Sequence, residues 1–255
     1  MKENNEPSRR SFLRSLSVGA CLVTGLPDVF ASVTDKPSSP KISLQKNDTV
    51  LFQGDSITYW YRKMDAMGGN DSQAMGSGYA LLTASELLNR HAEKNLKFFN
   101  KGISGNIVKD LEARWDADCL SLKPNVLSIL IGVNDFSLKM REKKGSASEY
   151  RESYHRLLDR TMLALPDVKL IIAEPFAING LIHVNDTWFP GFDEYRQVAK
   201  ETAEKYKAAF IPLHSIFEKA LRAVPNPYWS GDGIHPSMAG AGLMAKAWVE
   251  AFRNA

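Results

Sequence analysis

Short apolar runs alternate with helical patterns from residue 49 to residue 252, and this alternation constrains the fold more than any other feature. Five runs have the length and the boundaries of buried strands: residues 49–52, 97–99, 126–131, 168–172 and 209–213. Apolar residues recur every three or four positions in five further segments: residues 79–91, 107–120, 150–165, 195–206 and 238–252. Such alternation favours parallel strands joined by right-handed helical crossovers. We therefore predict an α/β fold, a three-layer α/β/α sandwich around a mostly parallel five-stranded sheet.

The N-terminus carries the features of an export signal. Residues 8–14, Ser-Arg-Arg-Ser-Phe-Leu-Arg, resemble a twin-arginine signal, and a weakly apolar stretch follows at residues 16–23. A Val-Phe-Ala sequence suited to signal peptidase then predicts a signal peptide over residues 1–31 and a periplasmic or extracellular protein. Lipid anchoring through Cys21 is the less favoured alternative, because cleavage there would leave an apolar region of about six residues, below the expected 7–15.

The rest of the chain predicts one domain without a bound metal or cofactor. Residues 32–46 are rich in Ser, Pro, Lys and Thr and are predicted to form a linker, which places the domain at residues 47–255. No stretch approaches the roughly 20 apolar residues of a membrane span. The net charge of +3 is not gathered into basic runs, so nucleic acid is not indicated. Zinc-binding and nucleotide-binding motifs are missing, and Cys119 has no partner at metal-ligand spacing. The sequence leaves open whether the chain self-associates.

Four short segments follow the first four predicted strands, at residues 54–56, 102–106, 132–135 and 174–176. Ligands of parallel α/β sheets bind outside the carboxyl ends of the strands, so these segments are expected on one rim. The irregular segment at residues 59–78 is long for a compact domain, which is typical of a functional or mobile loop.

The rim contains a candidate nucleophile and a candidate base. A serine reacts only when a base can take its proton and a third group orients that base. Ser56 lies on a tight strand-to-helix turn that Gly54 permits, although such a turn alone is equally compatible with a helix cap. Asp232 precedes His235 by three residues in Asp-Gly-Ile-His-Pro, so its carboxylate can accept the Nδ1–H and leave Nε2 to face a serine. For the other four histidines we favour surface or packing roles.

Acyl transfer also needs hydrogen-bond donors for the oxyanion. The backbone N–H of Gly105 and the side-chain amide of Asn134 each follow a predicted strand, on the rim expected for Ser56. We therefore predict a catalytic triad of Ser56, Asp232 and His235, and an oxyanion hole formed by Ser56, Gly105 and Asn134.

Four motifs occur in order: Gly-Asp-Ser-Ile-Thr at 54–58, Asn-Lys-Gly-Ile-Ser-Gly-Asn at 100–106, Gly-Val-Asn-Asp at 132–135 and Asp-Gly-Ile-His-Pro at 232–236. With them, the chain resembles the SGNH (GDSL) hydrolase superfamily, named for its Ser, Gly, Asn and His residues. The resemblance covers residues 49–253. It implies a flavodoxin-like strand order and a serine esterase that requires neither a metal nor an organic cofactor.

Residues 51–58, 100–106, 113–115 and 127–135 are similar to bacterial acetylxylan esterases of this superfamily. This similarity implies removal of O-acetyl groups from carbohydrate, such as xylan-type oligosaccharides. Two departures leave the ester open. The family often has Asp after Ile-Thr, where this chain has Tyr-Trp-Tyr, and Gly231 replaces a tryptophan that commonly precedes the catalytic Asp. A lysophospholipase or thioesterase, and a non-catalytic exported carbohydrate-binding protein, are the alternatives.

Aromatic and basic side chains near these motifs are candidate substrate contacts. We assign this role to Tyr59, Trp60, Arg62 and Trp229. Aromatic rings suit stacking on sugars, but packing or a place at the rim explains these aromatic residues equally well.

Overall fold

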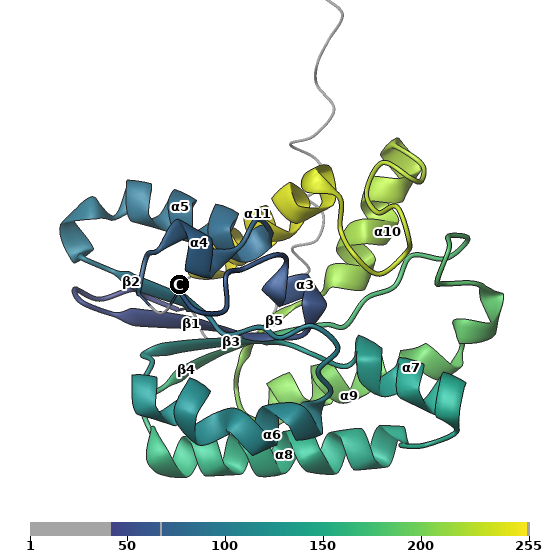
Figure 1. Cartoon of the computed structure of the whole chain (residues 1–255), viewed down its shortest axis with the longest axis horizontal. Coiled ribbons are helices and arrows are strands. Elements are labelled where there is room, and N and C mark those ends of the chain that lie inside the picture. Colours follow the sequence, from purple (N-terminus) through teal and green to yellow (C-terminus); the bar gives the residue numbers. More distant parts are fainter. Residues whose placement is uncertain (1–41, 67, 254–255) are drawn as a thin grey trace, which may run out of the picture. The chain divides into compact units, whose positions relative to one another are not determined.

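Five parallel strands form the central sheet of the computed structural model, which describes residues 42–66 and 68–253 (Figure 1). The strands are β1 (Thr49–Gly54), β2 (Lys97–Asn100), β3 (Val126–Leu130), β4 (Lys169–Ala173) and β5 (Ala209–Ile211). Their order in the sheet is β2-β1-β3-β4-β5, and every neighbouring pair is parallel. The predicted α/β fold and the flavodoxin-like strand order are confirmed, with all five strands parallel.

Helices cover both faces of this sheet (Figure 1). One layer contains α3 (Ser56–Tyr59), α4 (Ser72–Met75), α5 (Tyr79–Arg90), α10 (Leu213–Ala223) and α11 (Met238–Arg253). The other contains α6 (Val108–Asp118), α7 (Val133–Glu142), α8 (Ala147–Ala164) and α9 (Gly191–Lys205). Short 3-10 turns occur at Ala92–Lys94, Leu120–Leu122 and Asp186–Trp188. Because both faces are covered, β3 is buried over its whole length, which explains its continuous apolar sequence.

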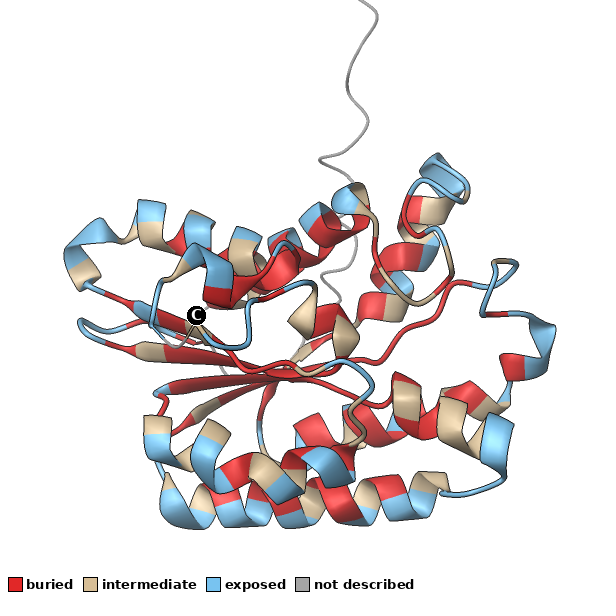
Figure 2. Ribbon diagram, viewed as in Figure 1, coloured by how far each residue is buried: buried red, intermediate tan, exposed pale blue. Residues whose placement is uncertain are grey.

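Buried tryptophans tie one helix to the sheet and join two helices of the same layer. Trp248 of α11 is fully buried and donates its indole N–H to Ser128 Oγ of β3 at 2.8 Å. Trp115 of α6 is also fully buried and donates to Thr161 Oγ1 of α8 at 2.8 Å. Both large side chains therefore bury apolar area without leaving an unpaired N–H. Figure 2 shows the buried residues along the sheet and on the helix faces turned toward it.

The predicted elements differ from the structure at one strand end and in four helices that the sequence pattern misses. The predicted strand at residues 209–213 is too long, because β5 ends at Ile211 and α10 begins at Leu213. Helices α3, α4, α7 and α10 lie outside the predicted helices. Both α3 and α4 are single turns capped by an aspartate, and such turns are too short to show a helical period.

The folded domain begins before residue 47. Ile42 and Leu44 are buried, and Lys94 Nζ donates to Leu44 O at 2.9 Å, so the end of the predicted linker belongs to the packed domain. The predicted signal peptide, its Cys21 and residues 32–41 lie outside the described residues. Within residues 42–66 and 68–253, no helix has both the length and the apolar character needed to cross a membrane.

Candidate active site

Ser56 is presented at the carboxyl end of β1 as the first residue of α3. The turn is tight, since a Cβ at Gly54 would lie 2.3 Å from Leu130 O, and glycine is therefore required by close approach. Asp55 caps the short helix by accepting a hydrogen bond from the Ile57 N–H at 3.0 Å. The Ser56 side chain is thereby directed away from the sheet, toward the loop that carries His235.

Ser56, His235 and Asp232 form one hydrogen-bonded chain. Ser56 Oγ lies 2.8 Å from His235 Nε2, and His235 Nδ1 lies 2.6 Å from Asp232 Oδ2. The loop before α11 holds this geometry through Ser230, which is fully buried. Its hydroxyl donates to His235 O at 2.7 Å and accepts from the Gly233 N–H at 2.9 Å. The structure thus brings together all three residues predicted for the triad.

Asp232 is held in its ionised form. Its Oδ1 accepts the N–H groups of Ile234 and His235 at 2.9 and 2.8 Å, while Oδ2 faces the imidazole. Partial burial alone would raise the pKa of Asp232, but these hydrogen bonds outweigh burial and hold the pKa below its ordinary value. A carboxylate in this state orients the neutral imidazole and favours the imidazolium that forms after proton uptake.

The predicted oxyanion donors come from the start of α3, the loop after β2 and the first turn of α7, and hydrogen bonds join these segments. Asn134 Nδ2 donates to Asn106 O at 3.1 Å, and the Ile103 N–H donates to Gly54 O at 3.1 Å. Gly105 is exposed with a φ of +80°, a conformation that favours glycine. Within the described residues, the backbone N–H groups of Ser56 and Gly105 have no acceptor, so both are free to bind an oxyanion.

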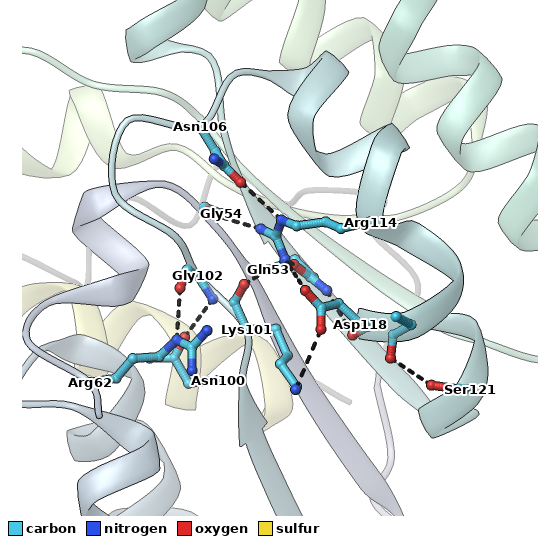
Figure 3. Close-up of polar contacts among 11 residues, drawn as sticks. Gln53, Gly54, Arg62, Asn100, Lys101, Gly102, Asn106, Arg114, Asp118 and Ser121 are labelled. Atoms are coloured by element: carbon cyan, nitrogen blue, oxygen red, sulfur yellow. Dashed lines mark hydrogen bonds and ion pairs between the residues drawn. The ribbon is translucent and has the colours of Figure 1, made fainter. Parts of the chain in front are cut away.

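An arginine of α6 supports the loop that carries Gly105 (Figure 3). Arg114 Nε donates to Asn106 Oδ1 at 2.9 Å, and its Nη1 donates to Gln53 Oε1 at 3.0 Å and Lys101 O at 2.8 Å. Arg114 also pairs with Asp118 at 2.9 Å. The sequence motif at residues 113–115 contains Arg114, but only the fold shows that it joins β1, α6 and the Gly105 loop.

Comparison with known proteins identifies the family. Residues 52–243 match the GDSL-like lipase/acylhydrolase family. An acetylxylan esterase from Geobacillus stearothermophilus is 33% identical over 214 residues, which cover 82% of this chain and 95% of that enzyme. The chain belongs to the GDSL-like lipase/acylhydrolase family. It is therefore an esterase, as its sequence motifs predict.

Solved structures of GDSL-family proteins share the fold over most of the chain. A protein from Parabacteroides merdae described as a GDSL-like lipase has a TM-score of 0.82 and 41% identity, covering 85% of this chain and 100% of that one. The acetylxylan esterase from Geobacillus stearothermophilus has a TM-score of 0.74 and 31% identity, covering 83% and 96%. Three solved variants of that enzyme are described as catalytic mutants, and they replace a serine, an aspartate and a histidine by alanine.

Two predicted substrate contacts of this GDSL-family esterase, Trp229 and Arg62, are buried, and their role in substrate binding stays a prediction. Trp229 is only 5% exposed, and its indole N–H donates to Val224 O at 2.7 Å. Arg62 is also buried, and its Nε donates to Gly102 O at 2.7 Å (Figure 3). Arg62 therefore braces the loop that carries Gly105.

Tyr59 and Trp60 remain beside the candidate site. Both are half-buried, and the Tyr59 amide is packed against Gly102, where a Cβ would lie 2.5 Å away. The Trp60 ring lies over the His235 ring, with the centroids 5.4 Å apart. The role of either side chain in substrate binding stays a prediction.

Replacing Arg114 by Ala is expected to weaken both stability and catalysis. Asp118 and Gln53 would lose a partially buried partner, which costs about 2–4 kcal/mol and lowers the melting temperature by about 5–10 °C. The Gly105 loop would also lose its bond at Asn106, so kcat should fall about tenfold. Calorimetry and ester-hydrolysis rates measure the two effects. Arg114→Lys keeps the positive charge but lacks the planar guanidinium group, so it should restore stability only in part. A wild-type kcat in Arg114→Ala would contradict the supporting role of Arg114.

Two buried carboxyls lie directly behind the site. Asp55 precedes Ser56 and Asp135 follows Asn134, and in the described chain each has one buried carboxyl oxygen without a hydrogen-bond partner. Burial raises the pKa of Asp55 from 3.8 to about 7, and the negative charge of Asp135 contributes to this shift. Burial also raises the pKa of Asp135 to about 7.

These carboxyls predict a pH dependence of stability. Between pH of about 4 and 7 the folded state keeps protons that the unfolded chain releases, so the free energy of unfolding falls as pH rises through this window. Asp55→Asn removes one of these titrations and keeps an oxygen for the Ile57 N–H. The melting temperature of the variant minus that of wild type should therefore be about 5 °C larger at pH of about 8 than at pH of about 5. An equal difference at both pH values in calorimetry would refute the assignment.

Proposed function

We propose that this esterase hydrolyses carboxylic esters through a covalent acyl-enzyme on Ser56. The observation that carries the proposal is the hydrogen-bond chain from Ser56 through His235 to Asp232, at 2.8 and 2.6 Å. His235 Nε2 takes the Ser56 proton as Oγ attacks the ester carbonyl, and Asp232 stabilises the resulting imidazolium. The replaced serine, aspartate and histidine of the catalytic mutants of the relative support this assignment.

The remaining steps use the same residues. The N–H groups of Ser56 and Gly105 and the Asn134 amide donate hydrogen bonds to the tetrahedral oxyanion. His235 then returns its proton to the leaving alcohol as the ester bond breaks. In the second half-reaction His235 removes a proton from water, the hydroxide attacks the acyl carbonyl, and Ser56 Oγ leaves with the proton from His235. The products are the alcohol and the free acid.

The proposed substrate is an O-acetyl ester of carbohydrate, of the kind found on xylan-type oligosaccharides. Support comes from the acetylxylan esterase of Geobacillus stearothermophilus, which is 33% identical over 82% of this chain, and from the family match over residues 52–243, which contains all the proposed catalytic residues. We also propose that the protein is exported. A twin-arginine-like sequence at residues 8–14 supports export, and cell fractionation of an Arg9→Lys, Arg10→Lys variant tests it: the variant should accumulate in the cytoplasm.

A substrate screen with the purified protein tests the proposed function. Acetate release is measured on acetylated xylo-oligosaccharides and other acetylated glycans, beside hydrolysis of a lysophospholipid, a long-chain ester and an acyl thioester. We expect the highest kcat/KM on an acetylated glycan, and no release by Ser56→Ala. Faster hydrolysis of the lysophospholipid or thioester would instead assign a lipid or thioester hydrolase. Glycan binding without turnover would assign a non-catalytic carbohydrate-binding protein.

A further inference from the structure

Trp60 covers one face of the His235 ring, although the mechanism above assigns it no step. The two ring centroids are 5.4 Å apart and the ring planes differ by 27°. This is a stacked arrangement, within the range of distances at which aromatic rings attract. The two ring nitrogens of His235 use their in-plane bonds to reach Ser56 and Asp232, so the ring face is available for a different kind of contact.

The backbone of Trp60 is fixed by the same short helix that presents Ser56. The Trp60 N–H donates to Ser56 O at 2.9 Å, and Trp60 O accepts the Ser77 N–H at 2.9 Å. The nucleophile and the ring over the base are therefore set by one helical turn. A shift of either residue would move the other.

Two glycines leave room for Trp60. A Cβ at Gly78 would lie 2.9 Å from the Trp60 Cβ and 3.4 Å from its Cγ, and a Cβ at Gly76 would lie 2.7 Å from Trp60 O. The next residue, Tyr61, has a φ of 57°, which is uncommon for a bulky side chain, and its ring meets the Trp60 ring edge-on at 5.3 Å. The surrounding chain thus holds a strained backbone that places the indole over the imidazole.

We infer that Trp60 is a positioning residue that acts on the catalytic base rather than on the ester, an inference that rests on the serine mechanism proposed above. The indole limits tilting of the imidazole between its two hydrogen bonds. When the proton moves from Ser56 Oγ to His235 Nε2, the indole face meets a cation, and the attraction becomes stronger. Trp60 therefore stabilises the charged form of His235 more than the neutral form, which lowers the barrier to acyl transfer.

Other titratable side chains belong to the segments next to this base and its partners. Asp232 contacts the imidazole directly. Asp55 and Asp135 adjoin Ser56 and Asn134, and Arg62 follows Trp60 by two residues. His183 belongs to the segment whose amide donates to Asp232 O at 2.9 Å. A change at Trp60 leaves all of these groups in place, so a shift in the pH profile of a Trp60 variant reports on the ring contact.

Kinetics with p-nitrophenyl acetate, which contains no sugar, tests the inference. Trp60→Leu should lower kcat about tenfold. It should also move the acid limb of kcat/KM to lower pH, by up to about one pH unit, because the imidazolium of His235 loses its contact with the indole face. Trp60→Phe keeps a ring over His235 and should restore most of both quantities. Tyr61→Leu, the matched control, removes a ring that contacts Trp60 but not His235, and should keep the wild-type acid limb.

The outcomes separate this inference from the proposed function. An effect confined to KM for acetylated xylo-oligosaccharides, with an unchanged acid limb on p-nitrophenyl acetate, would make Trp60 a substrate contact and overturn the inference. Labelling by a fluorophosphonate needs no ester substrate. Failure of wild type to label would defeat the serine mechanism itself, whereas equal labelling rates of wild type and Trp60→Leu would defeat only the role of Trp60. If Trp60→Leu does not fold, Gly78→Ala, whose Cβ displaces the indole, must reproduce the shifted acid limb.

Discussion

Replacing Ser56 by Ala is expected to lower kcat by about 10⁴- to 10⁶-fold while the protein stays folded. The substitution removes the attacking oxygen, so hydrolysis by an acyl-enzyme becomes impossible. Its structural cost is small, because among the described residues the Ser56 hydroxyl makes one hydrogen bond, to His235 Nε2 at 2.8 Å. The melting temperature should therefore change by about 2–4 °C. Ester hydrolysis and calorimetry on the same preparation measure both quantities.

His235→Ala should cause a loss of the same order, and the double variant should lose little more. A serine without its base and a base without its serine are both ineffective, so the effects do not add. His91→Ala is the matched control, because His91 lies at the end of α5 and contacts Glu93. Losses of kcat that multiply in the double variant, or an equal loss in His91→Ala, would contradict the action of Ser56 and His235 as one catalytic unit.

Replacing Asn134 by Ala is expected to lower kcat by about 10²- to 10³-fold with little change in KM. One hydrogen of Nδ2 is used at Asn106 O, at 3.1 Å, and the second is available to the oxyanion. The charge on that oxygen develops as the tetrahedral state forms, so the lost bond raises the barrier more than it weakens substrate binding. Steady-state kinetics on a small acetyl ester separates kcat from KM.

An asparagine at the other end of the sheet provides the control for this variant. Asn125 accepts the Thr49 N–H at 2.8 Å, at the start of β1, whereas Ser56 lies just beyond its end. Asn125→Ala should therefore affect stability and leave kcat unchanged. A loss confined to KM in Asn134→Ala would show that Asn134 binds the substrate without stabilising the oxyanion.

The sheet could be predicted from the sequence because its strands are buried on both faces and read as short apolar runs. The candidate triad and oxyanion residues were predictable for a related reason. Strand ends locate the rim, and Asp232 lies within three residues of His235, so a few local motifs define most of the geometry. The structure brings these residues together, and their catalytic roles stay predictions until the variants are measured.

Residues whose role depends on burial could not be assigned in this way. Trp229 and Arg62 lie near the catalytic motifs in sequence, but the fold buries both and pairs them with the backbone carbonyls of Val224 and Gly102. Arg114 gains its role from partners 8 to 61 residues away. Ile42 lies in a stretch with the composition of a linker, and its burial depends on contacts that local composition does not record.

Peptide mapping after fluorophosphonate labelling tests the central claim most directly, because it identifies the nucleophile without assuming a substrate. We expect one stoichiometric adduct, on the peptide that contains Ser56. The adduct should be lost in Ser56→Ala and form much more slowly in His235→Ala. Ester hydrolysis that is fully inactivated by an adduct on another residue, with Ser56 unmodified, would contradict the account.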